Sequence, residues 1–139
     1  MAQGLLLAQL GEKHDGWRIE SAGVAAMEGT PASQKTLQIL SEKGIDLSFH
    51  KARQINLYLM EQFALILVME RRHKHILQTQ YPDFAAKIYL LSEMIGKDHE
   101  IDDPGGGTYE DYQRTAFEIE SILSHGLVKI EQLATDSPG

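Results

Sequence analysis

The chain has 139 residues, of which 42% are hydrophobic, and it contains no cysteine. This length and apolar content predict a single globular domain over residues 1–139, and the lack of cysteine excludes disulfides, thiolate metal sites and thiol catalysis by the residues present. The formal net charge of -7 argues against a nucleic-acid partner or an anionic membrane surface. The longest apolar run, residues 63–69, is too short to cross a bilayer and no signal-peptide pattern precedes it, so we expect a cytoplasmic protein.

The first third of the chain predicts two helices with an edge strand between them. Residues 1–10 are apolar at helical spacing and stop at Gly11, where a residue with positive φ can close a helix. Residues 17–21 alternate apolar and polar side chains, which is typical of an edge strand covered on one face. Thr30-Pro31 offers a helix cap followed by a proline, and a helix over about 33–43 is predicted to follow.

The middle of the chain predicts two buried strands that alternate with helices. Asn56 can cap a short helix through Glu61, and residues 63–69 then form a continuous apolar run typical of a central strand buried on both faces. Residues 71–79 predict a basic helix, and residues 88–91 predict a second short buried strand. Strands alternating with helices indicate an α/β fold around a parallel sheet.

The last part of the chain predicts one long helix after a glycine-rich loop. Its core-facing stripe recurs at spacings of four, three and four residues and consists of Tyr112, Ala116, Ile119 and Leu123. Residues 134–139 are polar and are predicted to form a flexible tail.

Three segments, residues 44–55, 63–70 and 102–107, resemble the low-molecular-weight protein tyrosine phosphatases in order and spacing. The resemblance runs from Met1 to a helix ending near Leu127 and implies a three-layer α/β/α fold of the phosphotyrosine phosphatase I type. It also implies a phosphotyrosine protein as substrate and no cofactor. The family opens with a strand that runs into a phosphate-binding loop, Cys-x5-Arg-Ser/Thr, and this chain begins with residues that match those directly after that loop. We therefore expect an N-terminally truncated domain in which the first strand is missing.

Asp103 is the predicted catalytic residue. A proline on one side and glycines 105–107 beyond it can aim this carboxylate at a substrate, although Asp-Asp-Pro-Gly is also an ordinary surface turn. In the family that the chain resembles, the matching aspartate protonates the leaving tyrosine oxygen and later activates water. A positioned acid contributes roughly 10²–10⁴-fold to such a reaction.

Two further residues are predicted to contact substrate. Met27 falls in the loop where the family places a bulky side chain over the cleft, and a flexible, polarizable methionine can pack on an aromatic ring. Tyr109, just beyond the glycines, is a second candidate rim residue. The alternatives are a minor core filler for Met27 and packing of the last helix for Tyr109.

No metal site is predicted. His50, His73 and His75 could suggest a metal, but His73 and His75 are two residues apart and point to different faces of one helix. No third ligand is placed beside either of them. The basic stretch 50–54 is a marker of the resemblance, and we interpret it as structural.

The leading hypothesis is a phosphotyrosine phosphatase lineage that works through a cysteine phosphoenzyme, with this chain inactive as it stands. A non-catalytic phosphatase-like binding protein is the alternative. An arsenate reductase relative ranks lower, because the later part of the chain lacks the cysteines that would relay electrons. Loss of an interior strand would remove about five buried side chains, each worth roughly 1.5–3 kcal/mol. We therefore predict that a homo-oligomer, a partner's strand or an exchanged element fills the gap in the sheet.

Overall fold

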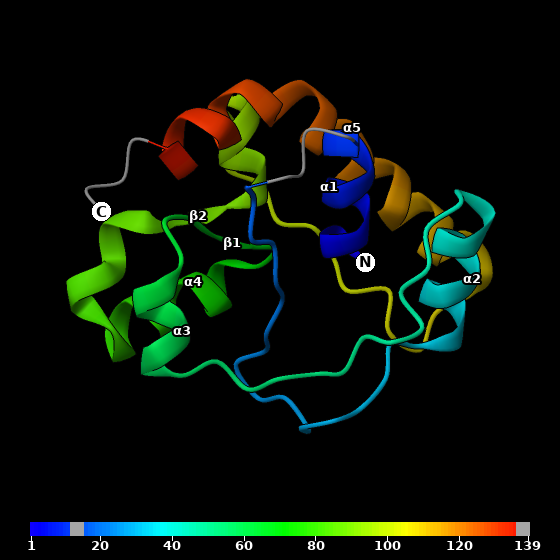
Figure 1. Ribbon diagram of the computed structural model, residues 1–139, viewed down its shortest axis with the longest axis horizontal. Coiled ribbons are helices and arrows are strands. Elements are labelled where there is room, and N and C mark those ends of the chain that lie inside the picture. The colour runs from blue at the N-terminus through cyan, green and yellow to red at the C-terminus, as the bar shows by residue number, and fades with distance from the viewer. Residues whose placement is uncertain (12–15, 136–139) are drawn as a thin grey trace.

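The computed structural model describes residues 1–11 and 16–135, which form an α/β fold (Figure 1). The elements in chain order are α1 (Ala2–Leu10), α2 (Gln34–Glu42), α3 (Leu57–Gln62), β1 (Ile66–Val68), α4 (Arg71–Gln80), the 3₁₀ helix η2 (Pro82–Lys87), β2 (Ile88–Leu90), the 3₁₀ helix η3 (Leu91–Ile95) and α5 (Tyr109–Thr135).

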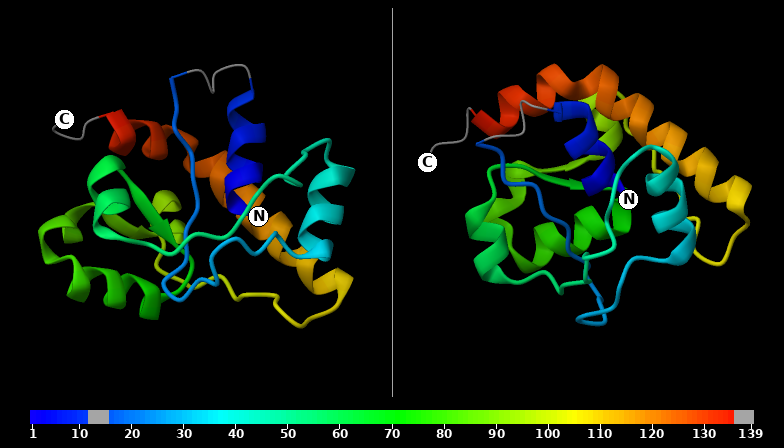
Figure 2. Two further views of the ribbon diagram at one scale, coloured as in Figure 1. Left: turned by 60° about the horizontal axis from the view of Figure 1, so that its bottom comes forward. Right: turned by 45° about the vertical axis from the view of Figure 1, so that its right-hand side comes forward.

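The sheet of the described residues has two parallel strands, β1 and β2. Ile66 pairs with Ile88 and Val68 pairs with Leu90, and α4 with η2 forms the crossover that parallel strands require. Helices α1, α2 and α5 lie on one side of the sheet, and α3 and α4 lie on the other (Figure 2). This is the three-layer α/β/α arrangement that the family resemblance implies.

Each face of β1 packs into its own hydrophobic cluster. Leu67 contacts the larger cluster, which is built mainly by α1, α2, η3 and α5, whereas Ile66 and Val68 contact the smaller cluster around Met60 and Leu77. Successive side chains of a strand point to opposite faces, so this alternation follows directly from the extended backbone. The core therefore lies on both sides of a very small sheet.

Helix α5 confirms the predicted stripe, since Tyr112, Ala116, Ile119 and Leu123 are all buried. The helix continues through Thr135, and residues 136–139 lie outside the described residues, so the flexible tail predicted over residues 134–139 stays a prediction.

Of the two helix caps predicted, Asn56 is confirmed and Thr30 is not. Asn56 caps α3 as predicted, because its side-chain oxygen accepts a hydrogen bond from the Leu59 N–H at 2.9 Å. The cap of α2 is Ser33, whose hydroxyl accepts from the Thr36 N–H at 3.2 Å. Thr30 instead bonds the carbonyl of Met27, so the Thr30-Pro31 cap prediction was wrong.

The predicted strands are shorter than the apolar runs. Residues 17–21 have no strand assignment, because no ladder partner lies beside them among the described residues. Strand β1 covers three residues rather than seven, and those residues are half-buried rather than fully buried. Residues 17–21 and β1 line one cavity rather than pairing with each other, and β1 pairs with β2 over three residues only.

Candidate functional site

A cavity of about 1100 Å³ lies between residues 16–26 and residues 62–70. Apolar side chains line it from both helical layers, and they include Met1, Ala2, Leu6, Leu59, Leu77, Ile119 and Leu123. Asp102, Asp103 and Pro104 also line it. The cavity therefore joins the predicted acid loop to the place where the sheet is interrupted.

The acid loop is attached to the carboxyl end of β1. The Ile101 N–H donates to the Met69 carbonyl at 2.9 Å, and Ile101 is buried with 2% of its surface exposed. Asp103 follows two residues later and is exposed. In open α/β sheets the crevice beyond the carboxyl ends of the strands is the usual ligand site, and Asp103 lies at that edge.

A local turn holds the Asp103 side chain. Its Oδ1 accepts a hydrogen bond from the Gly105 N–H at 2.9 Å, and the Gly107 N–H donates to the Pro104 carbonyl at 2.8 Å. Gly106 has φ of +78°, a conformation in which glycine is favoured. The bond from Gly105 holds Oδ1 of Asp103 against its own loop, and the bond between Gly107 and Pro104 closes the turn around it.

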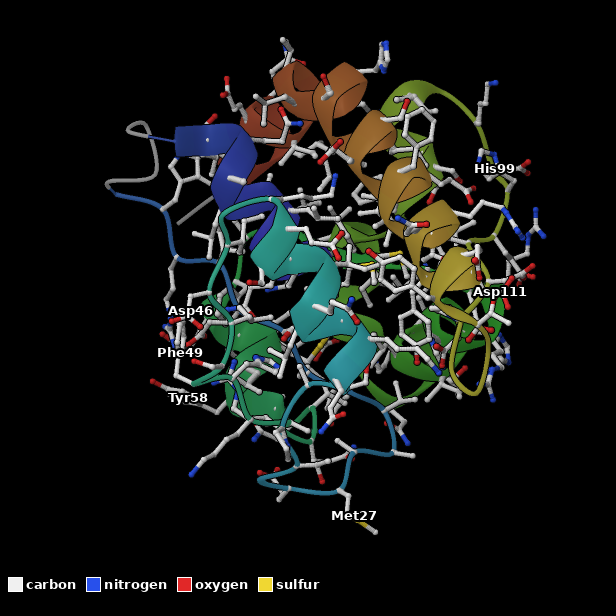
Figure 3. The ribbon with its side chains drawn as sticks, turned by 90° about the vertical axis from the view of Figure 1, so that its right-hand side faces the viewer. Met27, Asp46, Phe49, Tyr58, His99 and Asp111 are labelled. Atoms are coloured by element: carbon white, nitrogen blue, oxygen red, sulfur yellow. The ribbon has the colours of Figure 1, made fainter. Side chains whose placement is uncertain are left out.

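The start of α5 closes the other end of the loop. Thr108 and Asp111 form reciprocal side-chain to backbone hydrogen bonds at 3.2 and 2.9 Å, the pattern of a capping box. The bonds from Thr108 lower the pKa of Asp111. A Cβ on Gly107 would lie 2.6 Å from Asp111 Oδ2, so only glycine fits here without displacement. Figure 3 shows Asp111 beside this loop.

Helix α2 adds a contact that sequence reasoning missed. Lys35 Nζ donates to the Gly107 carbonyl at 2.8 Å across a separation of 72 residues. No local pattern signals a contact so distant in sequence. The Thr108-x-x-Asp111 box, in contrast, was readable as a helix start.

The two predicted substrate-contact residues do not lie in the cavity. Met27 is 80% exposed at the tip of its loop and points away from the fold (Figure 3), although Ala25 and Ala26 of the same loop line the cavity. The Tyr109 hydroxyl donates to the Glu42 carboxylate of α2, and this bond raises the pKa of Tyr109. Tyr109 also packs on the main core. Direct contacts therefore support the alternative role of Tyr109, which is packing of the last helix. The substrate role of Met27 and of Tyr109 stays a prediction.

The basic stretch 50–54 has structural contacts. The backbone of Gly23 bonds Arg53 and Ile55 at 2.8 and 2.9 Å, and the Gln54 side chain bonds the Ala26 N–H and the Val24 carbonyl at 2.8 Å. These bonds hold the 21–26 loop at one wall of the cavity. Burial, and then the positive charges of the N-terminus and Arg53, lower the pKa of His50.

The described serines near the cavity are engaged in structural bonds. The Ser21 hydroxyl donates to Gln3 Oε1 at 2.8 Å, and the Ser33 hydroxyl donates to Thr36 at 2.9 Å.

Over residues 1–11 and 16–135, no group of three His, Asp or Glu side chains is placed to share a metal ion. Within the same ranges, no helix combines the length and apolarity needed to cross a membrane.

The fold and the acid loop define an α/β domain with a carboxylate at the carboxyl edge of its parallel sheet. The family model for low molecular weight phosphotyrosine protein phosphatases matches residues 1–137. The chain therefore belongs to the low-molecular-weight protein tyrosine phosphatase family.

Two kinds of relative match the sequence. A probable low-molecular-weight protein-tyrosine-phosphatase of Ralstonia solanacearum is 36% identical over 104 residues, which cover 75% of this chain and 68% of that protein. A protein-arginine-phosphatase of Geobacillus stearothermophilus is 31% identical over 117 residues, which cover 84% of this chain and 78% of that protein.

Solved structures of the same two kinds match the fold. The low-molecular-weight protein tyrosine phosphatase of T. tengcongensis aligns with a TM-score of 0.86 and 34% identity over 93% of this chain and 88% of its own. The arginine phosphatase of Geobacillus stearothermophilus aligns with a TM-score of 0.85 and 30% identity over 96% of this chain and 86% of its own.

Proposed function

We propose that this chain supplies the proton-donor side of a phosphotyrosine phosphatase site, with Asp103 as the general acid, and that its own residues do not complete the reaction. One observation carries the proposal: Asp103 is exposed, restrained and at the cavity edge, while the sequence contains no cysteine. A cysteine nucleophile would have to come from outside the printed residues.

The chemistry assigned to Asp103 follows from the leaving group. A phenol has a pKa of about 10, so the phenolate is a poor leaving group at neutral pH and gains from protonation as the P–O bond breaks. The cysteine thiolate of the family forms the new bond to phosphorus, and Asp103 gives its proton to the departing oxygen. The resulting carboxylate then accepts a proton from the water that hydrolyses the phosphocysteine, which returns both groups to their starting states.

The first test uses the chain itself with p-nitrophenyl phosphate. We expect no hydrolysis above the buffer background, because neither a thiol nor an activated serine lies near Asp103 in the described residues. Turnover that survives repurification and follows the protein through chromatography would contradict the proposal.

The second test supplies the nucleophile in a chimera, with the strand and Cys-x5-Arg-Ser loop of a relative placed before Met1. Hydrolysis is expected to appear, and Asp103→Asn is expected to lower kcat by roughly 10²–10⁴-fold. The loss should be greater with phenyl phosphate than with p-nitrophenyl phosphate, because the poorer leaving group needs the acid more. Asp102→Asn is the matched control, and equal losses for the two variants would sink the assignment.

Phosphoarginine is a second candidate substrate, since one of the relatives and one of the aligned structures are named arginine phosphatases. The same chimera can be offered phosphotyrosine and phosphoarginine peptides of one sequence. Preference for phosphotyrosine by kcat/KM supports the first proposal, and preference for phosphoarginine replaces its substrate while leaving Asp103 as the proton donor.

A further inference from the structure

We infer that the outer face of α5 is an interaction surface for a second copy of this chain, and that the two α5 helices pair antiparallel about a two-fold axis. The outer face of α5 consists of Arg114, Phe117, Ser121, Ser124, Val128 and Glu131. This inference concerns assembly and does not depend on the catalytic proposal.

The spacing of the outer-face residues is that of a helix that pairs with another helix. They recur at three, four, three, four and three residues. Positions spaced in this way form one stripe, which can face a partner helix along its whole length. The side chains that α5 buries in the core, such as Ile119 and Leu123, belong to the opposite side of the helix. The helix therefore has a second, unused stripe.

The outer face carries two large apolar side chains that the fold leaves in solvent. Phe117 is 71% exposed and Val128 is 67% exposed. The right-hand view of Figure 2 shows α5 running along the rim of the molecule, where a second helix can approach it. Single exposed apolar side chains are common on protein surfaces, so the argument for a partner rests on the order of residues along this face.

The order of residues is self-complementary. A two-fold axis that passes midway between Ser121 and Ser124 brings these two short side chains together at the centre of an antiparallel pair. Phe117 precedes this midpoint by as many positions as Val128 follows it, so the ring of each copy meets Val128 of the other. Two-fold interfaces use the same patch on both copies. Each exposed apolar side chain thus finds an apolar partner.

Charge selects the antiparallel orientation. Arg114 and Glu131 are equally far from the midpoint, so each arginine meets the glutamate of the second copy. In a parallel pair each of these residues would meet its own kind, and like charges placed opposite each other are destabilising. The Arg114 side chain is 75% exposed, and its bond to Asp111 at 3.4 Å is a surface ion pair within the helix. Such pairs contribute little, so Arg114 can take a new partner.

The pairing is expected to be weak and to leave the candidate site open. A contact along one helix face is smaller than the roughly 1,200–2,000 Å² that stable interfaces bury, so the dimer should dissociate on dilution. None of the six outer-face residues lines the cavity. Ile119 and Leu123 line it from the buried side of α5, which a helix docked on the outer face does not cover.

Sedimentation velocity from about 10 µM to about 1 mM protein tests the association. We expect a monomer at the lower end of this range and a growing fraction of dimer at the upper end. Phe117→Glu should weaken the association by at least about tenfold, because it places a charge against an apolar side chain. Phe49→Glu is the matched control, since Phe49 is also 71% exposed but lies outside α5.

Reversal of charges tests which residues meet. Arg114→Glu alone should weaken the association by at least about fivefold, because it places two glutamates opposite each other at both ends of the contact. Combining Arg114→Glu with Glu131→Arg should restore the association, since every pair is then reversed. A purely structural effect of either substitution on its own helix would not be rescued in this way.

Cross-linking tests the orientation, and the chain suits it because it contains no cysteine. We expect a mixture of the Arg114→Cys and Glu131→Cys variants to form a disulfide-linked dimer with one copy of each. Arg114→Cys alone should stay uncrosslinked, because the two copies of this position lie about 25 Å apart along antiparallel helices.

Three outcomes overturn the inference. A chain that stays monomeric at about 1 mM has no such surface. Association that survives Phe117→Glu, or that falls equally with Phe49→Glu, uses another part of the molecule. Rapid cross-linking of Arg114→Cys alone, or a double charge reversal that does not restore the dimer, contradicts the antiparallel register. All the substituted side chains lie at the surface or are half-buried, and circular dichroism checks that each variant folds.

Discussion

Replacing Gly126 by alanine tests how tightly α5 packs on η3. A Cβ at Gly126 would lie 2.8 Å from the Met94 Cβ and 3.0 Å from the Met94 carbonyl oxygen. Neither atom can rotate away, since one is fixed to the backbone and the other belongs to it. Met94 is itself 3% exposed in the core, so the helix and η3 must move apart.

Two effects of opposite sign compete in this substitution. Alanine gains about 1 kcal/mol over glycine inside a helix, whereas overpacking a core contact costs typically 1–3 kcal/mol. Because a separation of 2.8 Å is shorter than real Cβ contacts allow, we place the cost at the upper end and expect a net loss of about 1–2 kcal/mol. With a urea m-value of about 1–3 kcal/mol/M, the midpoint should fall by roughly 0.3–2 M.

The assay is urea unfolding followed by circular dichroism, with Ser124→Ala as the matched control. Ser124 is exposed two residues earlier on α5, so alanine there should stabilise the protein by up to about 0.5 kcal/mol. The two variants on one helix should thus shift the midpoint in opposite directions. If Gly126→Ala raises the midpoint as Ser124→Ala does, helix propensity dominates and the close approach of α5 to η3 has been overestimated.

Three further predictions concern local contacts. Asn56→Ala should lower the free energy of unfolding by about 1 kcal/mol because it removes the cap of α3, whereas an equal loss for Asn56→Asp would argue against the cap. Burial favours a higher pKa for Glu93, but hydrogen bonds from Lys74 and the backbone N–H of Leu90 outweigh it and lower the pKa below the ordinary 4.5. The unfolded chain therefore binds this proton more readily, so stability should decline as the pH falls from 4.5 through the lowered folded pKa, and Glu93→Gln should reduce this decline in urea titrations at several pH values. Gly107→Ala should disrupt the capping box of α5, visible as faster hydrogen exchange at the N–H groups of Thr108 and Asp111, and unchanged exchange would refute the required close approach.

The sequence predicted the helices well because their signals are local. The Asn56 cap and the stripe on α5 involve residues within a few turns of each other, and both appear in the structure. The prediction of a strand at residues 17–21 was wrong. Alternating side chains indicate which face would be buried, but a strand also needs a neighbouring strand, because without one its backbone gains no ladder hydrogen bonds. The run at 63–69 was shortened for the same reason.

In the candidate site, too, local features could be predicted from the sequence and long-range contacts could not. The turn at Asp103 was predictable because proline and glycine around an aspartate form a short pattern, and the turn depends on a bond to Gly105 only two residues away. The catalytic role of Asp103 is implied by the family resemblance and stays a prediction. The contact from Lys35 and the cavity itself join segments that lie dozens of residues apart, so no pattern within one segment could report them.

The acid loop has three separate supports. Ile101 is tied to the carboxyl end of β1, Gly107 is bonded by α2, and Thr108 and Asp111 cap α5. Ile101 and its partner Met69 line the cavity, whereas Gly107, Thr108 and Asp111 do not. Two of the three supports therefore lie outside the cavity and should hold the loop whether or not the cavity is occupied. If a ligand binds in the cavity and slows hydrogen exchange at β1, exchange at Gly105 and Gly107 should stay constant, and a joint change would contradict this separation.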